Sequence, residues 1–266
     1  MSESLLNFVP NQGALDGRTI LVTGAGDGIG RVIAKAYARF GATVVLLGRT
    51  IPKLEKVYDE IMEEGGVEPA IYPLDMAGAT VHDYQEMSRI LKEQLGGLDG
   101  LVLNAAWLPG FVPFEQYDLE MWQKVMNIDL NANYLIIQAC MPLLSESSHA
   151  SILHSAHHLT RAYAGAFGIA KAGMAAMMSI VSDEYNNRDR FVRVNSIDTG
   201  PLLTQMRKLN YPGEDSRMLA EPSAVTGPYL YFMCDEAGQR TGETIRFEKI
   251  DADFTWPGLE QADIAK

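Results

Sequence analysis

A glycine-rich segment, TGAGDGIG at residues 23–30, constrains the fold of this chain more than any other feature. It follows a short apolar run at 19–23 and precedes a stretch at 31–40 in which apolar residues recur at helical spacing. Glycines at such a turn let the backbone approach a phosphate, and the free amides at the start of the helix face that anion. The segment therefore predicts a turn that binds the pyrophosphate of a dinucleotide, with an ordinary strand-to-helix turn as the alternative.

Strand-like and helix-like segments alternate along the whole chain. Strands are expected at 19–23, 43–47, 68–73, 98–103, 150–154, 191–197 and 244–247, and helices at 31–40, 52–64, 84–95, 119–144, 161–186 and 224–234. This alternation predicts a single-domain α/β Rossmann fold over residues 1–266, a doubly wound parallel sheet of about seven strands with helices on both faces. Residues 1–16 are expected to form an N-terminal extension and 248–266 a polar C-terminal tail. The irregular stretch Leu202–Pro222 is expected to be a mobile loop over the site.

Charge and composition exclude several kinds of partner. The 266 residues carry a formal net charge of −12, which disfavours nucleic acid and anionic membrane surfaces. Cys140 and Cys234 lie in apolar surroundings, as expected for buried free thiols in a reducing compartment. The first residues do not form a signal peptide, and no run reaches the roughly 18 apolar residues of a membrane span. We therefore expect a cytoplasmic protein that acts on a small molecule.

Several motifs, taken together, resemble the short-chain dehydrogenase/reductase family. The T-G-x-x-x-G-x-G pattern begins at Thr23, and Asn104-Ala105-Ala106 matches the N-A-G that closes the fourth strand of the family. Lys171 matches the active-site lysine, and Thr204 and Met206 match the family's T-x-M. The resemblance runs from about Gly17 to Thr244. It implies a nicotinamide cofactor and the reduction of carbonyls or oxidation of alcohols.

The resemblance also implies a set of cofactor-binding residues, namely Thr23, Gly24, Asp27, Gly28, Ile29, Gly30, Arg49, Asp75, Met76, Asn104, Ala105, Ala106, Lys171 and Thr204. Asp75 is implied to meet the adenine ring. The second strand ends in Gly48 and Arg49, where an acid would favour NAD. An uncharged residue followed by arginine suits the 2′-phosphate of NADP, so NADP is expected rather than NAD.

The catalytic positions depart from the family pattern. Phe167 stands four residues before Lys171, where the family has its proton-donating tyrosine. The family serine falls on His157, and the family asparagine falls on Asp129. Only Lys171 is retained, so the resemblance implies a degenerate catalytic tetrad with an altered proton donor.

Other side chains remain as substitutes for the missing groups. Tyr163 would lie one helical turn before Phe167, if the helix is continuous there. Ser155 would serve only if its loop is shifted. His154, His157 and His158 form a local cluster that could act as an acid, although no ligand motif supports a metal. Asp129 could form a structural ion pair with Lys171.

Three functions remain open at this point. The first is an NADP-dependent oxidoreductase whose substrate is unknown, with the apolar loop Trp107–Phe114 favouring a hydrophobic ligand. The second is a catalytically silent module that binds a nucleotide, and the third is a lyase or isomerase that uses His157 as its base. Family members commonly pair their two long helices across a two-fold axis, so the stretches at 119–144 and 161–186 predict a homodimer or homotetramer.

Overall fold

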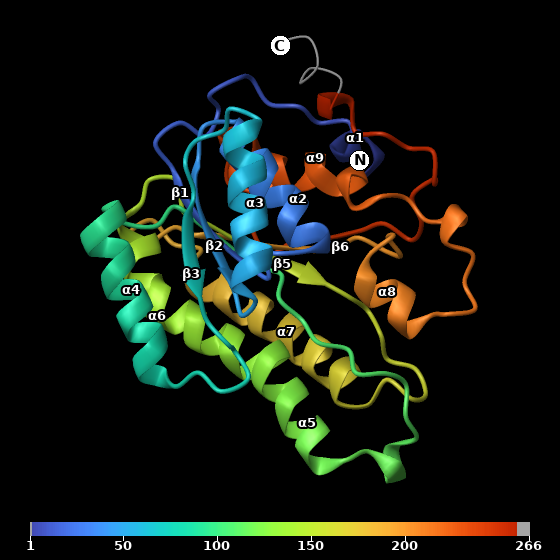
Figure 1. Cartoon of the computed structure of the whole chain (residues 1–266). Coiled ribbons are helices and arrows are strands. Elements are labelled where there is room, and N and C mark those ends of the chain that lie inside the picture. Colours follow the sequence, from blue (N-terminus) through green and yellow to red (C-terminus); the bar gives the residue numbers. More distant parts are fainter. Residues whose placement is uncertain (1, 260–266) are drawn as a thin grey trace.

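Seven parallel strands form one sheet at the centre of the structure, a computed structural model that describes residues 2–259 (Figure 1). The strands are β1 Thr19–Thr23, β2 Thr43–Gly48, β3 Ala70–Pro73, β4 Gly100–Leu103, β5 Ser151–Ala156, β6 Arg193–Asp198 and β7 Thr244–Arg246. Their spatial order is β3-β2-β1-β4-β5-β6-β7, and every neighbouring pair is parallel. The predicted parallel sheet is confirmed, and its direction of winding reverses between β1 and β4.

Helices cover both faces of this sheet. They are α1 Ser2–Leu6, α2 Gly28–Arg39, α3 Ile51–Glu63, α4 Val81–Leu95, α5 Leu119–Met126, α6 Ala132–Glu146, α7 Gly165–Glu184, α8 Gln205–Asn210 and α9 Thr226–Met233. Helices α2, α3 and α9 pack on one face, whereas α4, α6 and α7 pack on the other (Figure 1). Ile20 and Val22 of β1 enter the first layer, and Leu21 enters the second. The inner strands are covered on both sides and bury nearly all their side chains, whereas the edge strands β3 and β7 do not.

The predicted helix at 119–144 is interrupted. After α5, a π-helical segment, Asn127–Asn131, leads into α6. Asp129 lies in this segment and is only 1% exposed, and its Oδ1 accepts the backbone N–H of Trp107 at 2.9 Å. Short π-helical turns are common beside functional sites. Here the turn joins the Asp129 carboxylate to the loop that follows β4.

The predicted helix at 161–186 begins later, at Gly165. Tyr163 has a φ of 71°, which a right-handed helix excludes, so the residues before Gly165 form a turn. Gly165 also has a positive φ, and a Cβ there would meet the Tyr117 ring at 2.1 Å. Because these features depend on packing against the segment before α5, helical spacing alone predicts too long a helix.

Among the residues that the structure describes, one helix, α7, is long and apolar enough to cross a membrane by length and composition, contrary to the expectation from sequence. Half of its 18-residue apolar window is buried inside the fold. A core helix that covers a sheet needs the same apolar composition, because its side chains replace water on one face.

The stretch Leu202–Pro222 is more regular than predicted, because it contains α8 and a 3₁₀ turn, Ser216–Met218. Thr204 caps α8, and its hydroxyl accepts the backbone N–H of Arg207 at 3.1 Å. The segment does lie over the site, as described below. Whether it moves stays a prediction.

Both ends of the described chain pack against the domain instead of extending from it. Leu5, Leu6 and Leu15 are buried, and α1 contacts α9. Trp256, in the predicted polar tail, is 1% exposed, and its indole N–H donates to the backbone oxygen of Phe8 at 2.9 Å. Residue 1 of the predicted extension and residues 260–266 of the predicted tail lie outside the described residues.

Candidate active site

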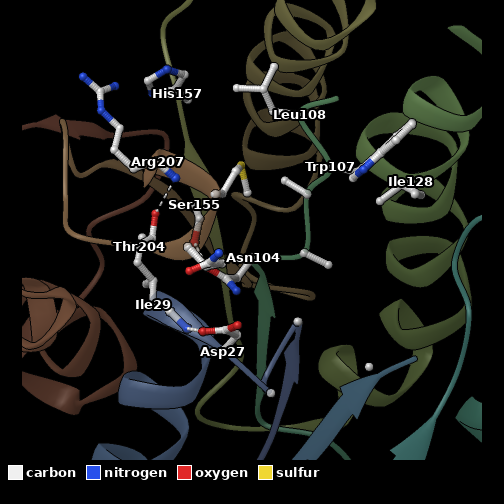
Figure 2. Close-up of a pocket in the computed structure, with 18 of the residues that line it drawn as sticks. Asp27, Ile29, Asn104, Trp107, Leu108, Ile128, Ser155, His157, Thr204 and Arg207 are labelled. Atoms are coloured by element: carbon white, nitrogen blue, oxygen red, sulfur yellow. Dashed lines mark hydrogen bonds between the residues drawn. The ribbon is translucent and has the colours of Figure 1, made fainter. Parts of the chain in front are cut away.

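A pocket of about 540 Å³ opens at the carboxyl ends of the strands, where the winding reverses. This is the position at which open α/β sheets bind their ligands. Figure 2 shows Asp27 and Ile29 at one end of the pocket and His157 and Arg207 at the other, with Asn104 and Ser155 between them. The pocket therefore joins the glycine-rich turn to the predicted catalytic residues.

The backbone of the glycine-rich turn packs closely against the loop after β4, so a side chain at position 30 would not fit. A Cβ on Gly30 would meet the backbone oxygen of Gly24 at 2.2 Å and the Asn104 Nδ2 at 2.6 Å. The hydroxyl of Thr23 accepts the backbone N–H groups of Asn104 and Ala105 at 2.9 and 3.0 Å. Of the predicted cofactor residues, Thr23 and Gly30 do not line the pocket and instead hold the two loops together.

Charged groups surround the start of α2. Asp27 caps the helix through the N–H of Gly28 at 2.7 Å, and its other oxygen pairs with the Lys53 ammonium at 2.6 Å. Partial burial opposes ionisation of Asp27, but Lys53 and the Gly28 N–H outweigh it and lower the pKa. Arg49 also lines the pocket and has no ion-pair partner within residues 2–259. Arg49 is thus the cation at this end that is free to meet an anionic ligand.

The remaining predicted cofactor residues are brought together as expected. Asp75, Met76, Asn104, Ala105, Ala106, Lys171 and Thr204 all line the pocket, as do Gly24, Asp27, Gly28, Ile29 and Arg49. Free amides at the start of α2, glycines without side chains and an unpaired arginine beside β2 fit a phosphorylated dinucleotide. Such a cofactor would supply or accept a hydride at the far end of the pocket.

Phe167 and Lys171 lie one turn apart on α7 at that far end. Phe167 is 3% exposed and packs with Leu108, Val125 and Leu159. The Lys171 ammonium donates to the backbone oxygen of Ser155 at 3.0 Å. Burial lowers the pKa of Lys171, and the nearby carboxylates of Asp129 and Asp198 partly oppose that effect. The site thus holds a buried cation where the sequence predicts it, with no hydroxyl at Phe167.

Asp129 lies behind this cation but does not pair with it. Its Oδ1 accepts the Trp107 N–H, its Oδ2 has no hydrogen-bond partner within the described residues, and Lys171 bonds to Ser155 instead. Burial raises the pKa of Asp129 to about 7, although the charge of Lys171 and the Trp107 N–H act in the opposite direction. The ion pair between Asp129 and Lys171 that the sequence allowed is therefore not formed.

His157 lines the pocket beside Phe167, with 6.1 Å between the ring centroids. Its Nδ1 lies 3.9 Å from Oδ1 of Asp198, the last residue of β6. Burial lowers the pKa of His157, and the Asp198 carboxylate opposes that shift. Sequence reasoning missed Asp198, because nothing in its local pattern distinguishes it from any polar residue that ends a strand.

Of the other proposed substitutes, only Ser155 lines the pocket. Tyr163 is 58% exposed and does not line the pocket. The Ser155 hydroxyl lies in the pocket but contacts Asn104 Oδ1 at 3.0 Å and the Tyr229 hydroxyl at 2.7 Å. His154 is buried below the site, and burial holds its pKa well below the ordinary value. Among residues 2–259, no group of three or more His, Cys, Asp or Glu side chains is arranged to hold a metal ion.

Comparisons with known proteins agree with this architecture. Residues 18–215 match the short chain dehydrogenase family. The chain is 37% identical to the uncharacterized oxidoreductase YciK of Escherichia coli K12 over 242 residues, which cover 90% of this chain and 95% of that protein.

Two similar crystal structures contain a cofactor. One is described as a short chain dehydrogenase from Shigella flexneri 2a complexed with NADP, and the other as one from Escherichia coli CFT073 complexed with NADPH. Each has a TM-score of 0.85 and 38% identity, and each match covers 89% of this chain and 99% of the other. The match over most of the chain, the seven-stranded sheet and the glycine-rich turn place this protein in the short-chain dehydrogenase family of oxidoreductases.

Proposed function

We propose that the protein is an NADP(H)-dependent oxidoreductase that transfers a hydride to or from a carbonyl or alcohol, with a proton donor other than the family tyrosine. The observation that carries the proposal is the continuity of one pocket, which runs from the glycine-rich turn and Arg49 to Lys171, Phe167 and His157. A dinucleotide seated on the turn would place its reactive ring beside these side chains.

The choice of NADP rests on the end of β2. Gly48 has no carboxylate to repel a 2′-phosphate, and Arg49 offers an unpaired guanidinium beside it. Lys53 lines the same part of the pocket but is already paired with Asp27. The NADP and NADPH held by the similar structures agree with this preference.

A hydrophobic substrate is supported by the other end of the pocket. Trp107 and Leu108 after β4 and Met206 and Leu209 of α8 line it. Apolar walls with a few convergent polar groups are typical of small-molecule sites. The polar groups at this end include His157 and Lys171, which would meet the reacting oxygen.

We favour an active enzyme over a catalytically silent module because the pocket keeps titratable groups where a proton is needed. His157 is 30% exposed at the pocket surface, and Lys171 is retained behind it. The first test is NADPH binding by calorimetry, followed by NADPH oxidation with a panel of aldehydes and ketones. Tight NADPH binding without turnover of any member would favour the silent module instead.

We also propose that the chain forms a homodimer or homotetramer. Ile169, Ala172, Ala176 and Ile180 form an exposed apolar stripe along α7. Small residues of this kind let a second helix approach closely. Met174 and Met178 of the same helix lie on its other side and are buried within the domain.

The proposed compartment is the cytoplasm. Cys140 and Cys234 are both free and buried, as expected for thiols in a reducing environment.

A further inference from the structure

We propose that His157 and Asp198 form a functional pair, in which His157 exchanges the proton with the substrate oxygen and Asp198 is the positioning residue that orients the imidazole. The inference rests on the proposed oxidoreductase function and deepens it. It assigns the missing proton donor to one side chain and names a second residue on which that side chain depends.

The pair is built by the register of the sheet. β5 and β6 run parallel, and Ala156 at the end of β5 is the register partner of Asp198 at the end of β6. His157 follows Ala156 directly, so its side chain begins one residue beyond the carboxylate on the neighbouring strand. The separation of 3.9 Å between Nδ1 and Oδ1 therefore follows from backbone pairing and not from a flexible loop alone.

The other contacts of Asp198 fix the direction of its carboxylate. Oδ2 accepts the backbone N–H of His158 at 3.1 Å and lies 3.3 Å from Nε of Arg246, the register partner of Asp198 on β7. Oδ1 is left facing His157, with only a long contact of 3.4 Å to the Gly200 N–H. The Asp198 side chain is 8% exposed, so water competes little for these positions.

The imidazole connects this buried carboxylate to the pocket. With Nδ1 toward Asp198, Nε2 is on the opposite side of the ring, and it has no hydrogen-bond partner within residues 2–259. The ring lies beside Phe167, where the family tyrosine would carry its hydroxyl. One imidazolium can thus supply both a hydrogen bond that polarises the substrate oxygen and the proton that the family tyrosine would supply.

The chemistry balances with groups that the site and its cofactor contain. In carbonyl reduction, the bound dinucleotide supplies the hydride that reaches the carbon. The Nε2–H of His157 then gives its proton to the oxygen, an O–H bond forms, and a neutral imidazole remains. Solvent at the exposed side of the ring restores the proton. In alcohol oxidation the neutral Nε2 accepts the same proton.

Four charged groups act on His157 from the elements around it. Asp198 of β6 favours the imidazolium, whereas Lys171 of α7, Arg207 of α8 and Arg161 of the turn before α7 oppose it. Of these four, only Asp198 can both stabilise the positive ring and accept a hydrogen bond from Nδ1. Its removal should therefore change the protonation and the orientation of His157 together.

Nuclear magnetic resonance of ¹⁵N-labelled histidine tests the pair in the intact chain. In the native protein, the neutral form of His157 should carry its proton on Nδ1, the ring nitrogen that faces Asp198, and should leave Nε2 basic. Asp198→Asn should lower the pKa of His157 by about one unit or more, because a carboxylate within 4–6 Å is lost. His82→Gln, on the exposed start of α4, is the control and should leave His157 unchanged.

Two results would overturn the pairing. One is a native His157 that carries its proton on Nε2 when neutral. The other is an unchanged titration in Asp198→Asn. The tautomer measurement needs no variant, so it decides the question even if Asp198→Asn fails to fold.

Turnover provides the second readout. With a substrate from the carbonyl panel, His157→Gln should remove the pH dependence of kcat, and Asp198→Asn should move it to lower pH by the same amount as the titration. An unshifted profile would contradict the positioning role. If the native chain does not bind NADPH, or turns over no member of the panel, the proposed function is contradicted. The tautomer result would still decide the pairing.

Discussion

The Lys171 ammonium lies 5.7 Å from the centre of the Phe167 ring and donates its hydrogen bond to the backbone of Ser155. A phenol at position 167 would therefore bring a hydroxyl into the field of a buried cation. A nearby positive charge favours the phenolate and so lowers the pKa of a tyrosine. Here the cation remains, and the group on which it would act is absent.

Phe167→Tyr should accordingly rescue a chain that has lost His157. We expect His157→Ser alone to lose most carbonyl reduction, and the double variant His157→Ser/Phe167→Tyr to regain on the order of 100-fold, the usual contribution of a general acid. NADPH oxidation with an aldehyde measures both rates. His157→Ser/Phe167→Leu is the matched control, because it changes the same site without adding a hydroxyl. Equal rates for the two double variants would contradict the prediction.

Arg49→Ala should weaken binding of NADPH but not of NADH. A charge-assisted hydrogen bond to the 2′-phosphate contributes roughly 1.5–3 kcal/mol, so the affinity for NADPH should fall by about 10- to 100-fold. Isothermal titration with the two cofactors measures the difference. Lys56→Ala removes an exposed positive charge from α3 outside the pocket and should leave both affinities as they are. Equal affinity of the native chain for NADPH and NADH would be the contrary result.

Asp129→Asn should stabilise the protein, and more so at alkaline pH. Burial raises the pKa of Asp129 in the fold to about 7, above its value in the unfolded chain. The protonated carboxyl therefore favours the fold fully below the unfolded pKa, and this stabilisation is lost as pH rises through about 7 and the buried group ionises. The variant should gain about 1–3 kcal/mol over the native chain at pH 8 and much less at pH 4.5. Denaturant unfolding at the two pH values measures it. A gain independent of pH would indicate relief of strain and not loss of a buried charge.

Ile180→Glu should disrupt the proposed subunit interface on α7. Ile180 is 65% exposed in the isolated chain, and a charge there would be buried against its own copy in a dimer. Light scattering at micromolar concentration should show a smaller particle for the variant than for the native chain. Val81→Glu places the same charge on an exposed apolar residue of α4 and should leave the assembly intact. A native chain that is already monomeric would refute the interface.

The sheet could be predicted from sequence because the residues that form each strand are adjacent in the chain. Strands β1, β2 and β4 are short apolar runs bounded by a glycine or a polar residue, and the turn at 23–30 fixes how β1 passes into α2. The ends of the elements were less predictable. Tyr163 has a left-handed conformation in the turn before α7, where Gly165 lies against the Tyr117 ring, and no periodicity records that contact.

In the candidate site, too, residues on one element could be predicted from sequence, whereas neighbours from different elements could not. The F-x-x-x-K spacing predicts that Phe167 and Lys171 lie one turn apart on one helix, as they do on α7. Asp198 becomes a neighbour of His157 only through the register of β5 with β6, about forty residues apart in sequence. α8 was missed because it is a single short helix whose start depends on the side chain of Thr204.

The hydrogen bond from Trp256 to Phe8 couples the stability of the two ends of the described chain. If the indole leaves its site beside Phe40, the backbone of the first residues loses a partner, and α1 loses part of its support against α9. The two segments should therefore open as one cooperative unit, with matched hydrogen-exchange rates that are faster than those of β1 and β4. Proteolysis near either end would then expose the other end to cleavage as well.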